Sequence, residues 1–234
     1  MSALEPFAYS DRGTPLSGLL ARPQGEARGA IVVYPTIANV TPAIERRAEM
    51  LAEAGFVALI ADFYGEPVAS FEASRPLAEK LRADPDHYRS RVVAAIAALR
   101  SCDPARGLSL GVIGYCMGGQ AALEAARAGE DLLLAASFHG ILSTALPADR
   151  AIPARILVCH GDADPMVPRE QVLGFWQEMD AVGANWHFHA YSGVRHGFTD
   201  PGSDARGMAA IAYDASADRQ SWAALMALCG EAFG

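Results

Sequence analysis

The sequence predicts an α/β protein with a mostly parallel, doubly wound sheet flanked by helices. Short apolar segments alternate with longer helical segments along the chain, which is the pattern of such a sheet. The chain has 234 residues, of which 51% are hydrophobic and 20% charged, enough to bury the core of one large domain. Because no linker, internal repeat or low-complexity tract interrupts it, we expect residues 1–234 to form a single domain.

The apolar runs predict strands of a buried sheet. Each is five to eight residues long and is rich in aliphatic, alanine or aromatic side chains. The run 108–114 is typical of a buried strand, whereas in 186–191 His187 and His189 alternate with apolar residues and are expected on the less apolar face. The expected strands are residues 30–34, 56–62, 108–114, 132–139, 155–160 and 186–191.

Helix signals separate these runs. Thr41-Pro42 predicts a helix start, with the hydroxyl as N-cap and proline in the first turn, and Gly55 ends that helix. Asp84-Pro85 starts a second helix, whose apolar residues from Tyr88 onward share one face that we assign to the core. Further helices are expected at 120–127, from 168 to 182 and from about 214 to 229, with a charged, helical, cap-like excursion at 66–82.

The segment Gly114-Tyr115-Cys116-Met117-Gly118 carries the main chemical signal. It places Cys116 on a sharp turn between a strand and an alanine-rich helix, the setting of a nucleophile elbow. Glycines on either side permit close backbone approach, and the N-terminus of the following helix favours thiolate over thiol. A buried structural cysteine is the alternative interpretation, because free cysteine often behaves as a small hydrophobe.

Partners for a nucleophilic cysteine follow in the chain. The segment Gly161 to Pro168 contains Asp162 and Asp164 just after a strand, and His196 follows the last strand. The order cysteine, aspartate, histidine is that of α/β-hydrolases and differs from the orders in chymotrypsin-like and subtilisin-like enzymes. In this arrangement the histidine moves the proton and an aspartate holds its tautomer.

With these motifs the chain resembles the dienelactone hydrolases over about residues 15 to 230. The resemblance rests on Gly-Tyr-Cys-Met-Gly-Gly at 114–119, Ala-Asp-Phe-Tyr-Gly at 61–65, His-Gly-x-x-Asp-Pro-x-Val-Pro at 160–168 and His-Gly-Phe at 196–198. It implies the α/β-hydrolase fold, with Cys116 as nucleophile, Asp164 as the triad aspartate in preference to Asp162, and His196 as the histidine.

Two departures from the family pattern concern activation and substrate. Well-studied members have a glutamate near residue 35 that pairs with the resting cysteine, whereas residues 34–39 here contain no carboxylate. We therefore expect activation by His196 and the helix N-terminus. Those members also carry a substrate-binding arginine four residues after the histidine, where this chain has Asp200, and a negative charge there is expected to repel an anionic substrate.

Further site residues are expected around the triad. The oxyanion hole is expected to use the N–H of Met117 and one N–H from Thr36 or Ile37, since Pro35 has none to give. Candidate substrate-binding residues are Tyr64, Tyr115, Arg75, Arg82 and His139, although each of these also has a structural interpretation: pocket wall for the tyrosines, a solvated helix face for the arginines, and a satisfied buried ring for His139.

Composition excludes other classes of function. The net charge is −8 and basic residues are not concentrated on a segment, so we expect no nucleic-acid partner. We also expect no membrane association, a cytoplasmic location and reduced thiols, because signal-peptide and membrane-span patterns are absent and the four cysteines are scattered. No metal or organic cofactor is implied, and either a monomer or a homodimer is compatible with the sequence.

The sequence thus predicts hydrolysis of a small ester, lactone or thioester through a cysteinyl acyl-enzyme. Two alternatives remain at this stage. A cysteine amidase or peptidase uses the same nucleophile, and a non-catalytic, ligand-binding relic of the fold is consistent with the missing glutamate.

Overall fold

An eight-stranded sheet forms the centre of the molecule, with the strand order β1-β2-β4-β3-β5-β6-β7-β8. The computed structural model describes residues 4–234. From β4 to β8 every pairing is parallel, and β2 pairs antiparallel with both β1 and β4. The predicted α/β class is therefore confirmed. The strands are β1 (Glu5–Asp11), β2 (Thr14–Ala21), β3 (Gly29–Tyr34), β4 (Phe56–Ile60), β5 (Leu110–Tyr115), β6 (Leu134–Phe138), β7 (Arg155–Gly161) and β8 (Trp186–Tyr191).

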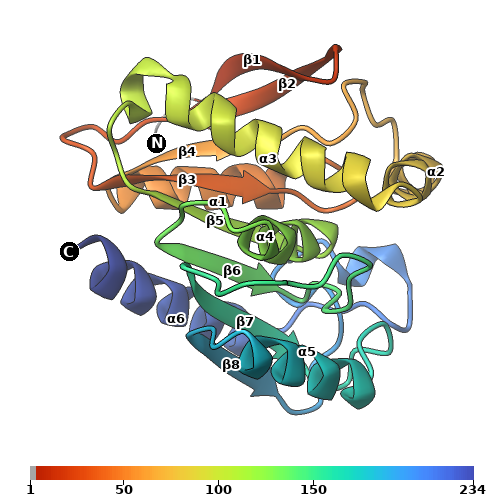
Figure 1. The fold of residues 1–234 in the computed structure, drawn as a ribbon. Helices are drawn as coiled ribbons and strands as arrows, with labels where there is room; N and C mark the ends of the chain where they lie inside the picture. Colours follow the sequence, from red (N-terminus) through yellow and green to blue (C-terminus); the bar gives the residue numbers. More distant parts are fainter. Residues whose placement is uncertain (1–3) are drawn as a thin grey trace.

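Helices cover both faces of this sheet (Figure 1). One apolar core lies between the sheet and α3, α4 and α5, and a second lies between the opposite face and α1 and α6. Strands β3 and β5 are buried along their whole length because they receive helices from both sides. The helices are α1 (Pro42–Glu53), α2 (Phe71–Arg82), α3 (Pro85–Ser101), α4 (Met117–Arg127), α5 (Arg169–Ala181) and α6 (Ala215–Phe233).

The N-terminal hairpin β1–β2 is an element that the sequence analysis did not identify. Its strands lie at the edge of the sheet, and their exposure alternates instead of staying low. A half-exposed edge strand needs fewer apolar residues than a central one, so its signal is weaker. The carboxylate of Asp62, just beyond β4, accepts the Ser17 N–H at 2.9 Å and thereby joins the hairpin to the loop that precedes α2.

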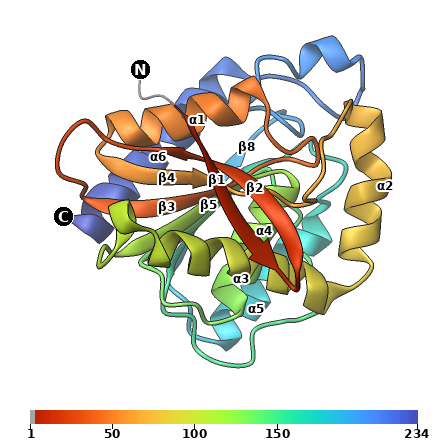
Figure 2. The same ribbon diagram turned by 90° about the horizontal axis from the view of Figure 1, so that it is seen from above.

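Helix α2 lies apart from both helical layers, at one end of the sheet (Figure 2). Ser70 caps it by accepting the Ala73 N–H at 3.1 Å. The helix lies within the segment 66–82, and it stands beyond the carboxyl ends of the parallel strands, where sites in such sheets form. Within residues 4–234, no helix has the length and apolar character needed to cross a membrane.

Candidate active site

Cys116 occupies a strained turn between β5 and α4. Its backbone has φ 57° and ψ −117°, a left-handed conformation that is costly for a residue with a side chain. The two flanking glycines make the turn sterically feasible: a Cβ on Gly114 would lie 1.8 Å from the Gly118 carbonyl oxygen, and one on Gly118 would lie 2.0 Å from the Tyr34 oxygen. Helix α4 begins at Met117, directly after the cysteine and earlier than expected, so its N-terminus faces the sulfur.

Asp164 and His196 come together as the sequence predicted. The Asp164 Oδ2 atom lies 2.7 Å from Nδ1 of His196, and both residues are only 3% exposed. Asp164 is held in turn by the Met166 N–H, which donates to Oδ1 at 2.9 Å. The Nε2 atom on the far side of the His196 ring is buried and has no hydrogen-bond partner of normal geometry among the described residues. Because Nδ1 is held by Asp164, this nitrogen is the one through which His196 interacts with the Cys116 thiol.

The electrostatics of Cys116 and His196 are coupled. Burial favours the neutral thiol, but the nearby His196 charge and hydrogen bonding outweigh it and lower the pKa of Cys116 below its usual value. For His196 burial favours the neutral ring, yet the Cys116 charge and the Asp164 hydrogen bond raise its pKa to about 10. Each member of the pair therefore favours the charged form of the other, thiolate for Cys116 and imidazolium for His196.

Two backbone N–H groups also act on the sulfur. Hydrogen bonding from the N–H groups of Met117 and Ile37 contributes to the low pKa of the Cys116 thiol. These are two of the residues expected to form the oxyanion hole. The third candidate, Thr36, uses its hydroxyl to accept the Ala38 N–H at 3.2 Å within the same turn. The low pKa of the Cys116 thiol thus depends on His196 and on backbone N–H groups.

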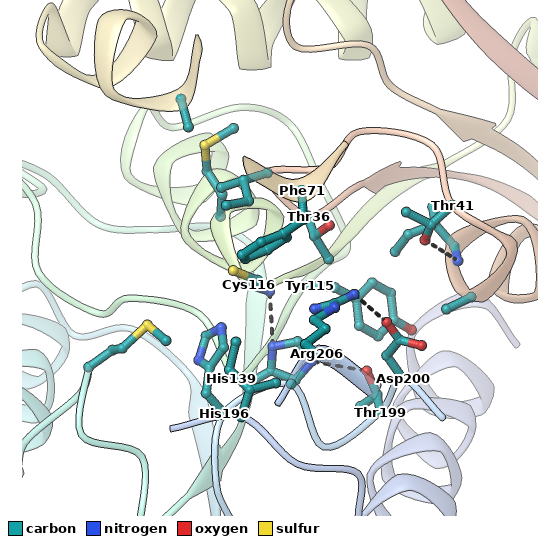
Figure 3. Close-up of a pocket in the computed structure, with 18 of the residues that line it drawn as sticks. Thr36, Thr41, Phe71, Tyr115, Cys116, His139, His196, Thr199, Asp200 and Arg206 are labelled. Carbon is teal, nitrogen blue, oxygen red and sulfur yellow. Dashed lines mark hydrogen bonds and ion pairs between the residues drawn. The ribbon is translucent and has the colours of Figure 1, made fainter. Parts of the chain in front are cut away.

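His139 lies in the wall of the site with both ring nitrogens engaged. Its Nδ1 accepts the backbone N–H of Cys116 at 3.1 Å, and its Nε2 lies 2.9 Å from the Thr199 hydroxyl (Figure 3). Burial and the neighbouring His196 charge hold the pKa of His139 well below its usual value. A neutral ring that accepts at Nδ1 must carry its proton on Nε2, so Nε2 donates to Thr199.

A cavity of about 270 Å³ opens at Cys116 and His196. Its walls come from the turn after β3, the elbow, the segment that follows His196, and one face of α2. The α2 face includes both arginines that the sequence analysis named, Arg75 and Arg82, together with Phe71, Ala78 and Glu79. Tyr115 also lines the cavity, whereas the Tyr64 hydroxyl donates to the Ile37 carbonyl at 2.9 Å. The lining also includes seven large apolar side chains: Ile37, Ile44, Met117, Ile141, Met166, Met208 and Ile211.

Arg206 is a cavity residue that the sequence analysis missed. It donates to Asp200 Oδ2 at 2.6 Å, and its guanidinium lies 5.1 Å from the centroid of the Phe71 ring. Asp200 is therefore not the uncompensated negative charge that the sequence suggested, since an ion pair neutralises it within the cavity wall. A turn and a short helical segment carry Arg206, and neither gives a pattern in the sequence that would reveal this contact.

Other polar candidates are held outside the reacting centre. Asp162 forms an exposed ion pair with Arg169 at 2.9 Å, in keeping with Asp164 being the better match to the family's aspartate. The ring of His160 is buried against Phe188, 5.7 Å between centroids. Among residues 4–234, no cluster of three or more histidine, cysteine or carboxylate side chains is arranged to hold a metal ion.

The fold and the arrangement of cysteine, histidine and aspartate define the chain as an α/β-hydrolase by architecture. It belongs to the dienelactone hydrolase family, whose model matches residues 16–233. A crystal structure of a dienelactone hydrolase-like promiscuous phosphotriesterase from metagenomic libraries is 31% identical, with a TM-score of 0.91 and 99% of each chain covered.

Two sequence relatives agree with this membership. A Bradyrhizobium protein named as a probable 2-oxo-3-(5-oxofuran-2-ylidene)propanoate lactonase is 30% identical over 202 residues, 80% of each chain. An uncharacterised Caenorhabditis elegans protein is 36% identical over 148 residues, which cover 62% of this chain and 94% of that protein.

Proposed function

We propose that this protein hydrolyses a small ester, lactone or thioester through a covalent intermediate on Cys116. The observation that carries the proposal is the coupling of Cys116 to His196 at the floor of an apolar cavity, with Asp164 2.7 Å behind the imidazole. Family membership adds support, and so does the lactonase name of the Bradyrhizobium relative.

The proposed reaction starts with attack of the Cys116 sulfur on the acyl carbon. The carbonyl π electrons move to oxygen, and the N–H groups of Met117 and Ile37 stabilise the resulting oxyanion. The intermediate then expels the leaving group, which takes the proton from His196 Nε2. In the second half, His196 removes a proton from water as the water attacks the thioester. The carboxylic acid departs, and thiolate and imidazolium are restored.

Cavity size and lining indicate the class of substrate. A volume of about 270 Å³ accommodates a small molecule, and the apolar residues around Cys116 suit a short or cyclic acyl group. Arg75 and Arg82 on α2, and Arg206 across the cavity, are the cations available to a charged substituent. We propose Arg75 and Arg82 as substrate contacts at the mouth, where both are exposed.

A substrate panel with matched variants tests the proposal. Activated short-chain esters, a five-membered unsaturated lactone, a thioester and the amide analogue of one ester are assayed with wild type, Cys116→Ala and Cys116→Ser. A phosphotriester is included because of the name of the metagenomic relative. We expect ester, lactone or thioester turnover by wild type, its loss in Cys116→Ala, and an acyl adduct on Cys116 by mass spectrometry when deacylation is slow.

The panel also separates the alternatives. Equal rates for wild type and Cys116→Ala would contradict the proposed mechanism. Preferential cleavage of the amide over its matched ester would favour an amidase. A ligand that binds the cavity and stays intact beside an unmodified Cys116 would favour a ligand-binding protein.

A further inference from the structure

Two tyrosine hydroxyls bind the carbonyl groups of the same two residues whose N–H groups act on the Cys116 sulfur. Tyr64 donates to the Ile37 carbonyl at 2.9 Å, and Tyr88 donates to the Met117 carbonyl at 2.8 Å. We infer that Tyr64 and Tyr88 are positioning residues that set the direction of the two oxyanion-hole donors. This inference rests on the proposed function and identifies residues that serve the site without lining its catalytic floor.

The Ile37 side of the site needs such a support. Ile37 lies in a turn between Thr36 and Asn39, so no helix or strand holds its carbonyl in place. A residue in a turn can rotate its peptide groups at low cost, and a rotation of Ile37 would turn its N–H away from the sulfur. The Ile37 N–H shares a peptide group with the Thr36 carbonyl, which accepts the Asn39 N–H at 3.0 Å. The Tyr64 hydroxyl holds the next peptide group through the Ile37 carbonyl, so the two contacts together restrict rotation about the backbone of Ile37.

The Met117 side is held by the neighbouring helix in the same layer. Tyr88 is on α3 and is 4% exposed, and its hydroxyl reaches the first residue of α4. This contact fixes the start of α4 against α3, where the helix leaves the strained Cys116 turn. A helix terminus tends to fray, so the added hydrogen bond keeps the Met117 N–H directed at the sulfur.

One aromatic side chain connects the two tyrosines. Phe63 is 1% exposed, and its ring centroid lies 6.1 Å from those of both Tyr64 and Tyr88. Packing of this kind fixes ring orientation. Burial raises the pKa of both phenols well above the usual value, so both hydroxyls keep their protons and remain donors over the whole working pH range.

The chain supplies a matched control tyrosine. Tyr34 is fully buried, and its hydroxyl donates to the Val92 carbonyl of α3 at 2.8 Å. Replacing it with phenylalanine removes the same kind of hydrogen bond, from a buried phenol to a backbone carbonyl, at a residue that does not bond to Ile37 or Met117. Any loss of stability common to the three tyrosine-to-phenylalanine variants is therefore separated from an effect on the site.

The test compares Tyr64→Phe, Tyr88→Phe and Tyr34→Phe by three measurements. The pH profile of Cys116 alkylation by iodoacetamide reports the thiol pKa and requires no substrate turnover. We expect its inflection to move to higher pH by roughly half a unit in Tyr64→Phe and in Tyr88→Phe, because each weakens one N–H contact to the thiolate. The profile of Tyr34→Phe is expected to match wild type.

Steady-state kinetics and thermal unfolding complete the test. We expect kcat to fall about tenfold in Tyr64→Phe and in Tyr88→Phe, with KM nearly unchanged. This decrease in kcat is smaller than the decrease caused by removing a whole oxyanion-hole donor. All three variants are expected to unfold at similar temperatures. Alkylation profiles of Tyr64→Phe and Tyr88→Phe that coincide with that of Tyr34→Phe would overturn the inference. If the profiles shift but wild type cleaves no substrate of the panel, the positioning role stands and the proposed hydrolysis fails.

Discussion

The backbone N–H of Cys116 donates to Nδ1 of His139 at 3.1 Å, and both residues have positive φ, 57° and 42°. They lie just beyond the carboxyl ends of adjacent parallel strands, β5 and β6. The contact therefore joins two strained turns, and the other ring nitrogen bonds to Thr199, three residues after His196. His139 links the Cys116 turn to the segment that carries the His196 imidazole.

This link predicts different effects of two replacements of His139. Asparagine tolerates positive φ and offers an oxygen acceptor, whereas leucine does neither. We expect His139→Leu to lose about tenfold or more of kcat/KM and to unfold several degrees lower, and His139→Asn to lose less of both. Kinetics and thermal unfolding of both variants check this, and equal behaviour of the two would contradict it.

The Asp164–His196 contact predicts a large loss of activity on removal of the carboxylate charge. In Asp164→Asn the amide can no longer stabilise the imidazolium, and its NH₂ group favours the wrong tautomer of the ring. We expect kcat to fall roughly 10²- to 10⁴-fold with an intact fold. Asp162→Asn is the control because that carboxylate pairs with Arg169 away from the ring. Similar losses in both variants would refute the assignment of Asp164.

The lowered pKa of Cys116 predicts selective alkylation. The thiolate is the reactive form, so reaction with iodoacetamide rises as the pH passes the thiol pKa, and a lowered pKa places that rise at lower pH. Cys102 is the control because it is also partly exposed, while burial raises its thiol pKa. At pH 7 we expect Cys116 to be labelled first by peptide mapping, and His196→Ala to move its profile to higher pH.

The Cys116–His196 pair also determines how activity is expected to change with pH. Activity should rise with pH as the Cys116 thiol ionises, and fall again as the imidazolium of His196, with a pKa raised to about 10, loses the proton needed by the leaving group. Faster labelling of Cys102 than of Cys116 at pH 7, or an activity profile that keeps rising beyond pH 10, would contradict this description of the pair.

The main chain around Cys116 could be predicted from local sequence because its determinants are local. The apolar run of β5, the glycines around Cys116 and the alanine-rich helix after it each act within a few residues. The helical character of α2 also followed from its charged pattern. Here the local preferences agree with the final fold, so pattern and structure coincide.

Contacts between distant segments could not be predicted in this way. Arg206 reaches the Phe71 ring only because the segment after His196 folds back over the cavity. The interaction of the Tyr64 hydroxyl with the Ile37 carbonyl likewise depends on the packing of one loop against another. A single sequence reveals burial and periodicity, but a contact between two distant polar side chains produces no periodic or apolar pattern along the chain.

The Arg206–Asp200 ion pair predicts a charge-dependent change in substrate preference. In Asp200→Asn the Arg206 charge is no longer balanced, so an anionic ester should bind better, with KM lower by roughly three- to tenfold. In Arg206→Gln the uncompensated carboxylate should raise KM for the same ester. KM for a neutral isostere should change little in either variant, and Asp162→Asn controls for net charge. Identical shifts for anionic and neutral esters would contradict this prediction.

The close approach of α4 to the end of β3 predicts opposite effects of alanine at two glycines. A Cβ on Gly118 would lie 2.0 Å from the Tyr34 carbonyl oxygen, and since both groups belong to packed backbone, neither can move cheaply. Overpacking of this kind costs about 1–3 kcal/mol or more, so we expect Gly118→Ala to unfold at a temperature about 2–10 °C lower than wild type. We also expect a loss of activity, because the added methyl displaces the turn that holds Ile37.

Gly174 provides the matched comparison. It lies on the exposed side of α5, and nothing is within 4 Å of the position that its Cβ would occupy. Alanine has a higher helix propensity by about 1 kcal/mol, so Gly174→Ala should unfold about 2–4 °C higher with unchanged kcat/KM. Thermal unfolding and kinetics of the two variants and wild type test both expectations. A Gly118→Ala protein as stable and as active as wild type would mean that the start of α4 is not packed tightly against the Tyr34 carbonyl.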